Sequence, residues 1–398
     1  MSPQTQLVAT TRLIASPEFQ GALEAAADNA ADVDRRGRFP SEAVEALRSA
    51  GALGWGVPKC YGGAGANLQD LAEATLELSA RCAATGMVFA MHQIQVACIV
   101  RHLGDSAWFE DYLRRLVTEQ RLIASATSEV GVGGDVRRSI AAIEPAADSS
   151  LGLIQFEKKA STISYGAHAD DLLTTVRRNP AADPGDQVLV LTHFSEMDAK
   201  PTNEWDTLGM RGTCSPGFVV RAICGPDQVL PAPFATIAVE TMVPFSHILW
   251  AHVWLGLSAE AFAKAQTFVR GQSRQNPGTT PPTASRLADL SVNMAGFRAL
   301  VHAAVDEFMS LDDGVGRAQL SAMGYAVRIN NLKIAASEAA VEACQGALRI
   351  CGFLGYGNNG PYSVGRHLRD AHSAALMIAN DRLLATNAAL LLVHREGK

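Results

Sequence analysis

Residues 122–135, with the sequence LIASATSEVGVGGD, mark the point at which the chain changes its pattern. Upstream, Ala, Leu and Glu are abundant and apolar residues recur at intervals of three and four, which is typical of amphipathic helices. Downstream, short apolar runs alternate with Gly, Pro and Asp, which is typical of strands. Near residue 243 the helical pattern returns. The sequence therefore predicts a helical domain at 1–120, a β domain at 121–236 and a second helical domain at 237–398.

Within these limits the elements can be placed more closely. A proline and a cap-type residue, Pro40 and Ser41, begin one N-terminal helix, and Gly51 ends it. The other predicted helices are Leu68–Arg81, Ala84–Leu103, Phe245–Arg270, Thr283–Leu311, Arg317–Gly352 and Val364–His394. The predicted strands are Leu151–Phe156, Leu172–Val176, Val188–Thr192 and Phe218–Cys224.

Composition excludes several classes of protein. With 34 Lys and Arg against 40 Asp and Glu, the net charge is −6, whereas a general nucleic-acid binder carries a basic face. No run approaches 18 consecutive apolar residues, and the first 17 residues do not read as a signal peptide. The seven cysteines include no C-x-x-C pair, so neither a disulfide framework nor a metal site is expected. We expect a soluble, cytoplasmic protein with no membrane or nucleic-acid partner.

Six motifs occur in an informative order. They are Phe39-Pro40-Ser41-Glu42 with the glycine-rich Tyr61–Gly65, then Ala126–Glu129 with Gly133-Gly134-Asp135, then Ala169-Asp170, Leu208–Thr213, Arg274 with Pro277-Gly278, and finally Gly352-x-x-Gly355-Tyr356 with Arg369-Asp370-Ala371. With them the sequence resembles the acyl-CoA dehydrogenase superfamily of flavoproteins over nearly its whole length. The resemblance implies an α+β multidomain fold: an N-terminal α-helical domain, a middle β-barrel-like domain and a C-terminal four-helix bundle.

The resemblance also implies FAD at the junction of the β domain and the bundle. An isoalloxazine needs an apolar wall with a few placed donors, which Thr127 and Ser128 can supply. The other implied cofactor-binding residues are Gly133, Arg274, Gly352, Gly355 and Asn380. In this family the contact made by Arg274 commonly comes from a second subunit. Both assignments have an alternative, because Thr127 can instead bond its own backbone and Arg274 can be a solvated loop residue.

The usual catalytic base is missing. In most of the family a Glu follows the Asp of R-D-A by eight residues, and here that position is Ile378. Three residues are candidates to replace it. His247 begins the first helix of the bundle and titrates near neutral pH, Glu240 lies just upstream, and His92 lies on a helix that we expect to face the substrate. Each has a plainer alternative, respectively a helix-end histidine, a solvated carboxylate and a core histidine.

Three functions follow in order of preference. The first is FAD-dependent α,β-desaturation of a specialised acyl thioester, carried by CoA or by an acyl-carrier protein. The second is a two-component flavin monooxygenase of the same fold, and the third is a binding module without redox chemistry. The resemblance implies an electron-transfer flavoprotein or a flavin reductase as partner, and assembly into a homodimer or homotetramer.

Overall fold

The computed structural model describes residues 13–147, 152–312, 314 and 316–394. The N-terminal part consists of α2 (Pro17–Arg36), α3 (Ser41–Ser49), α4 (Leu68–Arg81), α5 (Ala83–His102) and α6 (Ala107–Glu119). Local sequence sets several of their ends. The Ser16 hydroxyl accepts from the amide of Phe19, and Asn67 with Asp70 forms a capping box at the start of α4. The loop between α3 and α4 contains two short 3₁₀ turns, η1 (Ala52–Gly54) and η2 (Lys59–Tyr61).

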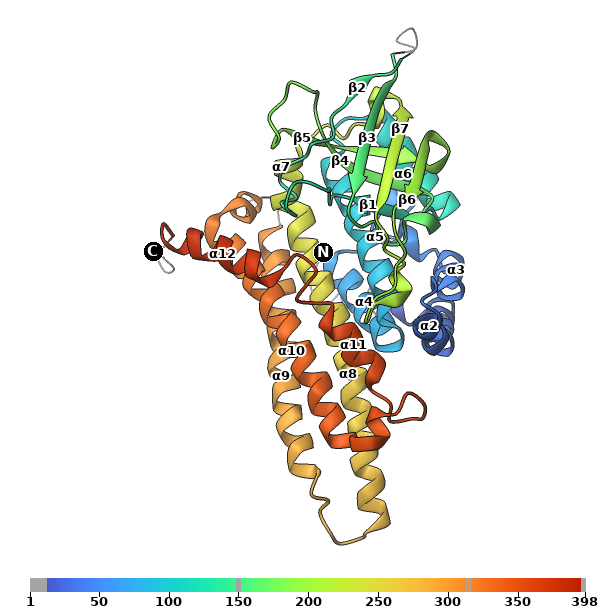
Figure 1. Ribbon diagram of the computed structural model, residues 1–398, viewed down its shortest axis with the longest axis vertical. Helices are drawn as coiled ribbons and strands as arrows, with labels where there is room; N and C mark the ends of the chain where they lie inside the picture. Colours follow the sequence, from blue (N-terminus) through green and yellow to red (C-terminus); the bar gives the residue numbers. More distant parts are fainter. Residues whose placement is uncertain (1–12, 148–151, 313, 315, 395–398) are drawn as a thin grey trace.

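The β domain consists of two small sheets (Figure 1). One has the order β1-β4-β5, from β1 (Ile123–Ala126), β4 (Asp171–Arg177) and β5 (Gln187–His193), with β1 parallel to β4. The other is antiparallel, in the order β2-β3-β7-β6, from β2 (Glu144–Pro145), β3 (Ile154–Ala160), β7 (Phe218–Cys224) and β6 (Met197–Pro201). Inward side chains of both sheets, such as Phe156, Val176 and Val220, share one core.

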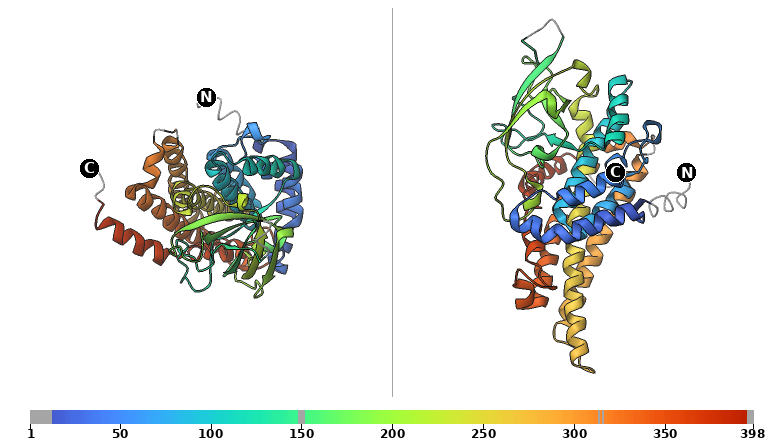
Figure 2. Two further views of the ribbon diagram at one scale, coloured as in Figure 1. Left: turned by 90° about the horizontal axis from the view of Figure 1, so that it is seen from above. Right: turned by 90° about the vertical axis from the view of Figure 1, so that its right-hand side faces the viewer.

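The C-terminal part begins with α7 (Phe234–Ile237) and a π-helical turn, η8 (Ala238–Met242). The long helices α8 (Val243–Gln275), α9 (Ala284–Leu311) and α10 (Met323–Tyr356) follow, with a 3₁₀ turn, η9 (Arg317–Ser321), before α10. Two shorter helices, α11 (Gly365–His372) and α12 (Asn380–Leu391), end the described chain. Seen from above, the N-terminal helices lie on one side of the molecule and α12 projects on the other (Figure 2).

Two of the predicted helices in this part differ from the observed ones. The sequence predicts a single helix over Val364–His394, but a turn at residues 373–379 separates α11 from α12. Ile378 has φ +50° in this turn, a left-handed conformation that no residue inside an α-helix can adopt. The predicted helix Arg317–Gly352 also differs, since α10 begins at Met323 and a break at Gly352 (φ +57°) lies inside it. The strand predicted from Leu151 begins at Ile154, and Leu151 itself lies outside the described residues.

Two helices of the described chain are long and apolar enough to cross a membrane, Ala83–His102 and Phe234–Gln275. Isolated polar residues interrupt the apolar runs of both helices, so neither helix contains 18 consecutive apolar residues. In the folded chain, 89% and 61% of their most apolar windows are buried. The close packing of α8 against α4 illustrates this burial, because a Cβ atom on Gly256 would lie 2.4 Å from the carbonyl oxygen of Leu76.

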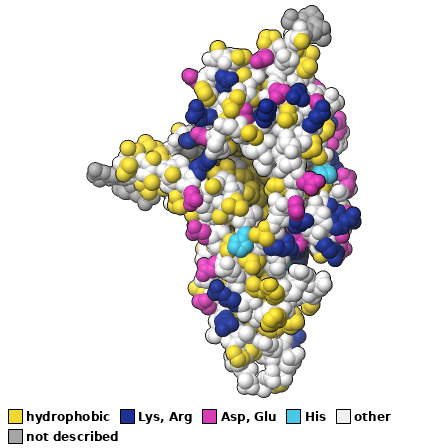
Figure 3. Space-filling model, in the orientation of Figure 1, with side chains coloured by type: hydrophobic (Ala, Val, Ile, Leu, Met, Phe, Trp, Pro, Cys, Tyr) yellow, Lys and Arg dark blue, Asp and Glu magenta, His cyan; other side chains and the backbone are white. Residues whose placement is uncertain are grey.

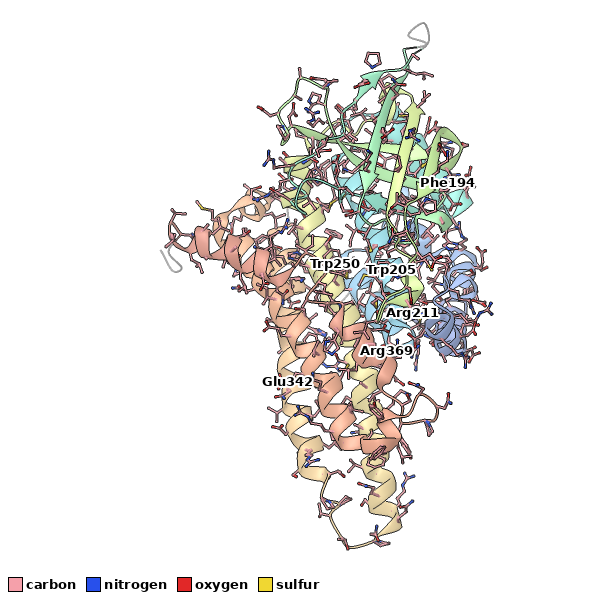
Figure 4. The ribbon with its side chains drawn as sticks, in the orientation of Figure 1. Phe194, Trp205, Arg211, Trp250, Glu342 and Arg369 are labelled. Carbon is pink, nitrogen blue, oxygen red and sulfur yellow. The ribbon has the colours of Figure 1, made fainter. Side chains whose placement is uncertain are left out.

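The R-D-A motif joins all three parts of the chain. The Arg369 guanidinium donates to Asp34 of α2 at 2.8 Å and to the carbonyl of Leu208 at 2.9 Å. The adjacent Asp370 carboxylate accepts from the amide of Met210 at 2.6 Å. Arg211 lies beside this contact and donates to the carbonyl of Asp34 at 2.8 Å, and Figure 4 shows Arg211 and Arg369 near one another at the junction. These bonds fix the position of α11 and of the turn that follows it.

Candidate functional site

The end of β1 provides the first polar groups of the site. Thr127 is half-buried, and its hydroxyl has no hydrogen-bond partner among the residues that the structure describes. Ser128 differs, because its hydroxyl donates to the carbonyl of Thr162 at 2.9 Å and accepts from the amide of the same residue at 3.2 Å. Thr127 therefore has a free hydroxyl for a ligand, whereas the Ser128 hydroxyl ties β1 to the segment after β3.

A glycine loop follows, and Glu129 anchors it. The Glu129 carboxylate accepts from the amide of Ala141 at 2.8 Å and from the hydroxyl of Ser139 at 2.6 Å, and it pairs with Lys158 at 3.3 Å. Burial raises the pKa of Glu129, but Lys158 and these hydrogen bonds outweigh burial and lower the pKa overall. The loop itself turns at Gly133 and Gly134, with φ of +61° and +75°.

The C-terminal helices meet this loop from the other side. Arg382 of α12 donates to the carbonyl of Gly133, and its guanidinium would contact a Cβ atom on Gly134 at 2.9 Å. Lys333 of α10 forms hydrogen bonds to the turn before α12. The Lys333 ammonium donates to the carbonyl of Ile378 at 2.9 Å and to Oδ1 of Asn380 at 2.8 Å. Burial lowers the pKa of Lys333 to about 8.

One face of α8 completes the site with His247, Trp250 and Trp254. His247 is buried, and its Nδ1 lies 3.1 Å from the carbonyl of Ile329. Burial, helped by the charge of Lys333, lowers the pKa of His247 to about 4. The indole nitrogens of Trp250 and Trp254 are buried, and no described residue accepts a hydrogen bond from them, which is uncommon for a donor in a protein interior. Lys333 also lies 5.8 Å from the ring centre of Trp254.

A hollow lies between the β domain and the C-terminal helices on the face shown in Figure 3. Figure 3 shows hydrophobic side chains gathered in this hollow, and Figure 4 places Trp250 at the same level. The residues at this junction fit a flavin. An isoalloxazine needs an apolar wall with a few hydrogen-bond donors, and the unpartnered indole N–H groups and the Thr127 hydroxyl need acceptors. Thr127, Gly133 and Asn380, predicted from the sequence as cofactor-binding residues, lie around one junction. The side chains of Asn380 and Ser128 at this junction are already hydrogen-bonded, Asn380 to Lys333 and Ser128 to the carbonyl of Thr162.

The candidate bases lie in different settings. Both ring nitrogens of His92 are bonded to backbone, Nε2 to the carbonyl of Leu53 at 2.8 Å and Nδ1 to the amide of Ile123 at 3.1 Å. His92 thereby joins the N-terminal helices to β1, and its part in flavin chemistry stays a prediction. Glu240 lies in η8, and its carboxylate forms an ion pair with Arg317 at 3.3 Å. Of the three candidates, only His247 has a ring nitrogen without a partner among the described residues, and it lies on the face of α8 given above.

The other predicted cofactor-binding residues, Arg274, Gly352 and Gly355, are not brought to this junction. Arg274 is exposed near the far end of α8. Gly352 breaks α10 with a backbone conformation that only glycine adopts readily, and Gly355 lies so close to Cys351 that a Cβ atom would come within 2.6 Å. Their contacts with a cofactor stay predictions.

A cavity of about 1200 Å³ opens elsewhere on the β domain, lined mainly by residues of β3, β6, β7 and the segment before β2. None of the predicted site residues lines it. Arg221 in its wall is paired with two other lining residues, Glu157 at 2.7 Å and Asp198 at 3.9 Å. We therefore place the functional site at the junction and not in this cavity.

The comparisons with known proteins agree with this geometry. Residues 19–120 match the model of the acyl-CoA dehydrogenase N-terminal domain, and residues 237–378 match that of the C-terminal domain. The chain belongs to the acyl-CoA dehydrogenase family. The resemblance inferred from the sequence motifs is thus confirmed, as is the expected fold of a helical domain, a sheet domain and C-terminal helices.

Curated relatives within this family include two kinds of enzyme. A dibenzothiophene monooxygenase of Rhodococcus qingshengii is 24% identical over 82% of this chain and 81% of its own. A short-chain specific acyl-CoA dehydrogenase of Clostridium acetobutylicum is 24% identical over 86% of this chain and 87% of its own. Among solved structures, FMN-bound TdsC from Paenibacillus sp. A11-2 superimposes with a TM-score of 0.79 at 21% identity, covering 96% of this chain and 98% of TdsC.

Sequence reasoning did not find Lys333 as a site residue. A signal for it is present, since Ile329, Lys333 and Ser337 recur at intervals of four and therefore share one face of α10 with buried neighbours. A lysine on the apolar face of a helix needs an acceptor in the interior. In this family member the acceptors come from the turn that carries Ile378.

Proposed function

We propose that this protein is a flavin-dependent monooxygenase that binds reduced flavin at the junction and uses molecular oxygen to oxidise an aromatic substrate. The observation that carries the proposal is the turn at Ile378. Where the family's desaturating enzymes need a carboxylate, this chain has an aliphatic side chain in a left-handed conformation, with Lys333 bonded to its carbonyl. The charged group next to that position is therefore a cation and not a base.

Desaturation of an acyl thioester requires removal of a proton from the α-carbon. Around the junction, the candidate that lacks an ionic partner and has a free ring nitrogen is His247. Its pKa of about 4 makes it a weak proton acceptor compared with the catalytic pKa near neutrality that such a step favours. A monooxygenase dispenses with this step, so the replacement of the glutamate does not count against it.

A bound flavin would supply the oxygen chemistry, and the chain's own residues would position it. Thr127 offers its free hydroxyl to the polar edge of the ring. The glycine loop at Gly133 and Gly134, together with Arg382, offers a backbone turn and a cation to a phosphate group. The apolar wall of α8 excludes water from the reacting face. Either FMN or FAD satisfies these contacts.

A second copy of the chain would complete the site. Arg274 and Gly352 lie far along the helices from Thr127, so within one chain they would not contact a cofactor held at the junction. Exposed apolar side chains near Gly352, namely Phe353, Leu354 and Tyr356, give this end of α10 a surface suited to another subunit. We therefore propose a homodimer or a larger assembly, with a separate flavin reductase as partner.

The test supplies the full-length protein with reduced flavin, generated by NADH and an unrelated flavin reductase, under labelled oxygen gas. Dibenzothiophene and indole serve as aromatic probes, since the names of related proteins and structures include them. We expect one labelled oxygen atom in a product that forms only when the protein is present.

The same preparation tests desaturation of an acyl thioester, the function that the sequence favours. A panel of acyl-CoA thioesters is added to the flavin-loaded protein without oxygen, with an artificial electron acceptor. Reduction of the acceptor, without label incorporation in the first experiment, would overturn the proposal in favour of a dehydrogenase. A protein that binds neither FAD nor FMN at micromolar concentration would instead support the binding module.

A further inference from the structure

The side of α12 that contacts the rest of the chain contains an amide. The two buried side chains of this helix are Leu383 and Asn387. The Asn387 amide accepts from Asn330 of α10 at 2.8 Å and donates to Asn331 at 2.9 Å. A surface helix normally turns its polar residues toward water and its apolar residues toward the core. In α12 part of the polar side faces inward, and its opposite side requires an explanation.

That opposite side is apolar and uncovered. The exposed residues between Leu383 and Val393 are all Ala, Leu or Val, and no ionisable residue occurs in this stretch. We call its large side chains the outer face of α12, namely Leu384, Leu391, Leu392 and Val393. Leu392 is 88% exposed and Val393 71%. The helix projects from the other helices (Figure 1), and Figure 3 shows hydrophobic side chains over this projection. Such a face marks a contact with another molecule.

The size of the outer face indicates which molecule covers it. A helix of 12 residues is about 18 Å long and about 10–12 Å wide, which is far below the roughly 800 Å² that each partner of an independent complex buries. The outer face alone is therefore too small to hold a separate protein. A second copy of this chain that is already bound at another surface, such as the exposed end of α10, would cover it at a high effective concentration.

Charge favours the same occupant. A twofold axis places the outer face of one copy against that of another, and no like charges meet because the face has no ionisable side chain. Helices that lie on a membrane carry Lys and Arg on their polar side. The one cation of α12 is Arg382, and its guanidinium is bonded to its own chain.

Arg382 also connects the outer face to the candidate flavin site. It donates to the carbonyl of Gly133, and its guanidinium would lie 2.9 Å from a Cβ atom on Gly134. Arg382 and the outer face belong to one continuous helix, Asn380–Leu391, with Val393 directly after it. A subunit that fixes the outer face therefore also fixes the position of the guanidinium on the glycine loop.

We propose that a second copy of this chain covers the outer face of α12, and that this contact keeps Arg382 on the glycine loop, so that flavin binding depends on assembly. The inference rests on the proposed function, because that function places a flavin phosphate at this loop. It adds a requirement to the site, since a single chain would hold the cation less firmly than an assembled one.

The test compares the full-length protein with the double variant Leu392→Ser/Val393→Ser. Both side chains are exposed in the single chain, so their loss leaves its packing intact. Light scattering over a dilution series should show the assembly dissociating at a concentration at least about tenfold higher. At a protein concentration between the two midpoints, the FMN dissociation constant should rise about tenfold, as the loss of one charge-assisted hydrogen bond implies.

Two further variants separate the effects. Val292→Ser is the matched control, because Val292 of α9 is 70% exposed but lies outside the outer face, and neither measurement should change. Arg382→Gln should weaken FMN binding about tenfold and leave the assembly unchanged. Adding Leu392→Ser/Val393→Ser to Arg382→Gln should weaken FMN binding no further, because both changes act through the same guanidinium.

Three results would overturn the inference. The first is an assembly that the double variant does not weaken, and the second is a set of FMN effects that add in the combined variant. The third is sedimentation of the unchanged protein, but not of the double variant, with phosphatidylcholine and phosphatidylglycerol vesicles, which would assign the outer face to a lipid surface.

A failure of the proposed function gives a different result. If the unchanged protein binds no FMN, the proposed function is refuted, and amide hydrogen exchange at 131–135 then decides the inference. Faster exchange in the double variant than in the unchanged protein would support the link between α12 and the glycine loop. Equal exchange would refute that link.

Discussion

The ammonium group of Lys333 lies 2.9 Å from the main-chain carbonyl of Ile378, and this contact holds a β-branched residue at φ +50°. A left-handed conformation costs such a residue on the order of 1–2 kcal/mol, so the turn must be stabilised by hydrogen bonds from other elements. We expect Lys333→Met to remove this stabilisation and to make the turn more mobile. Amide hydrogen exchange at 376–380 should accelerate at least about tenfold, with Lys264→Met, which lacks contact with the turn, as a control. Unchanged exchange would refute this role of Lys333.

Lys333 also gives a prediction for alkaline pH. Its pKa is about 8 in the folded protein and 10.5 in the unfolded chain, so between these values the unfolded chain binds more protons. The folded state therefore gains stability from this group as the pH rises from 8 toward 10.5. The melting temperature of the unchanged protein should rise relative to that of Lys333→Met over this interval. A constant difference would show that Lys333 does not titrate there.

The buried pair of Glu129 and Lys158 should show strong coupling. Glu129→Gln leaves the Lys158 ammonium buried without its carboxylate, and breaking such a pair costs about 3–5 kcal/mol. Lys158→Met should have a similar effect. The double variant should lose less free energy of unfolding than the sum of the two single variants, as measured by denaturant unfolding. Additive losses would mean that the two charges do not stabilise each other.

Thr127 should affect flavin binding but not stability. Thr127→Val preserves the shape of the side chain and removes a hydroxyl that has no partner in the described part of the chain. We expect the flavin dissociation constant, measured by fluorescence titration, to rise about three- to tenfold, with the melting temperature unchanged. Thr118→Val on α6, which bonds only to its own helix, is the control. An unaltered dissociation constant would assign the hydroxyl to solvent.

His92 should contribute to the loss of stability in acid. Burial lowers its pKa to about 4, below the unfolded value of 6.5. The unfolded chain therefore binds more protons between these values, and the stability contributed by the neutral ring is lost as the pH falls from 6.5 toward 4. Asp370, with a pKa raised by burial to about 6, acts in the opposite direction in both proteins. The melting temperature of His92→Gln should fall less between pH 7 and pH 5 than that of the unchanged protein. Parallel curves would contradict the prediction.

The exposed end of α10 should mediate assembly. Phe353 is 92% exposed and Tyr356 72% exposed, although both are large and apolar. We expect Phe353→Ser to reduce the mass measured by light scattering toward that of one chain. Phe194→Ser, at an exposed aromatic residue of the β domain, should leave the mass unchanged. An assembly that survives Phe353→Ser would place the subunit interface elsewhere.

Much of the fold could be predicted because its signals are local. The periodicity of α4 and the alternation in β7 are complete within the segments themselves, and both elements occur at the predicted residues. The division between α11 and α12 could not be predicted in the same way. The residues around Ile378 favour a helix, and the turn depends on a bond from Lys333, which is 45 residues away in sequence.

The candidate site shows the same limit. Motifs led to Thr127 and to the missing base, because each is defined by its position in a short pattern. The tautomer of His247 depends on the carbonyl of Ile329, which belongs to another helix. The unsatisfied donor of Trp250 could not be recognised before its surroundings were known, since an indole on a helix face usually indicates core packing.

The bonds made by Arg369 and Asp370 constrain when the protein can complete its structure during synthesis. Arg369 reaches back 335 residues to Asp34, and Asp370 reaches back 160 residues to Met210. A ribosome releases the N-terminal helices and the β domain well before α11. The three parts can therefore form separately, but they acquire their final relative positions only when almost the entire chain has been made.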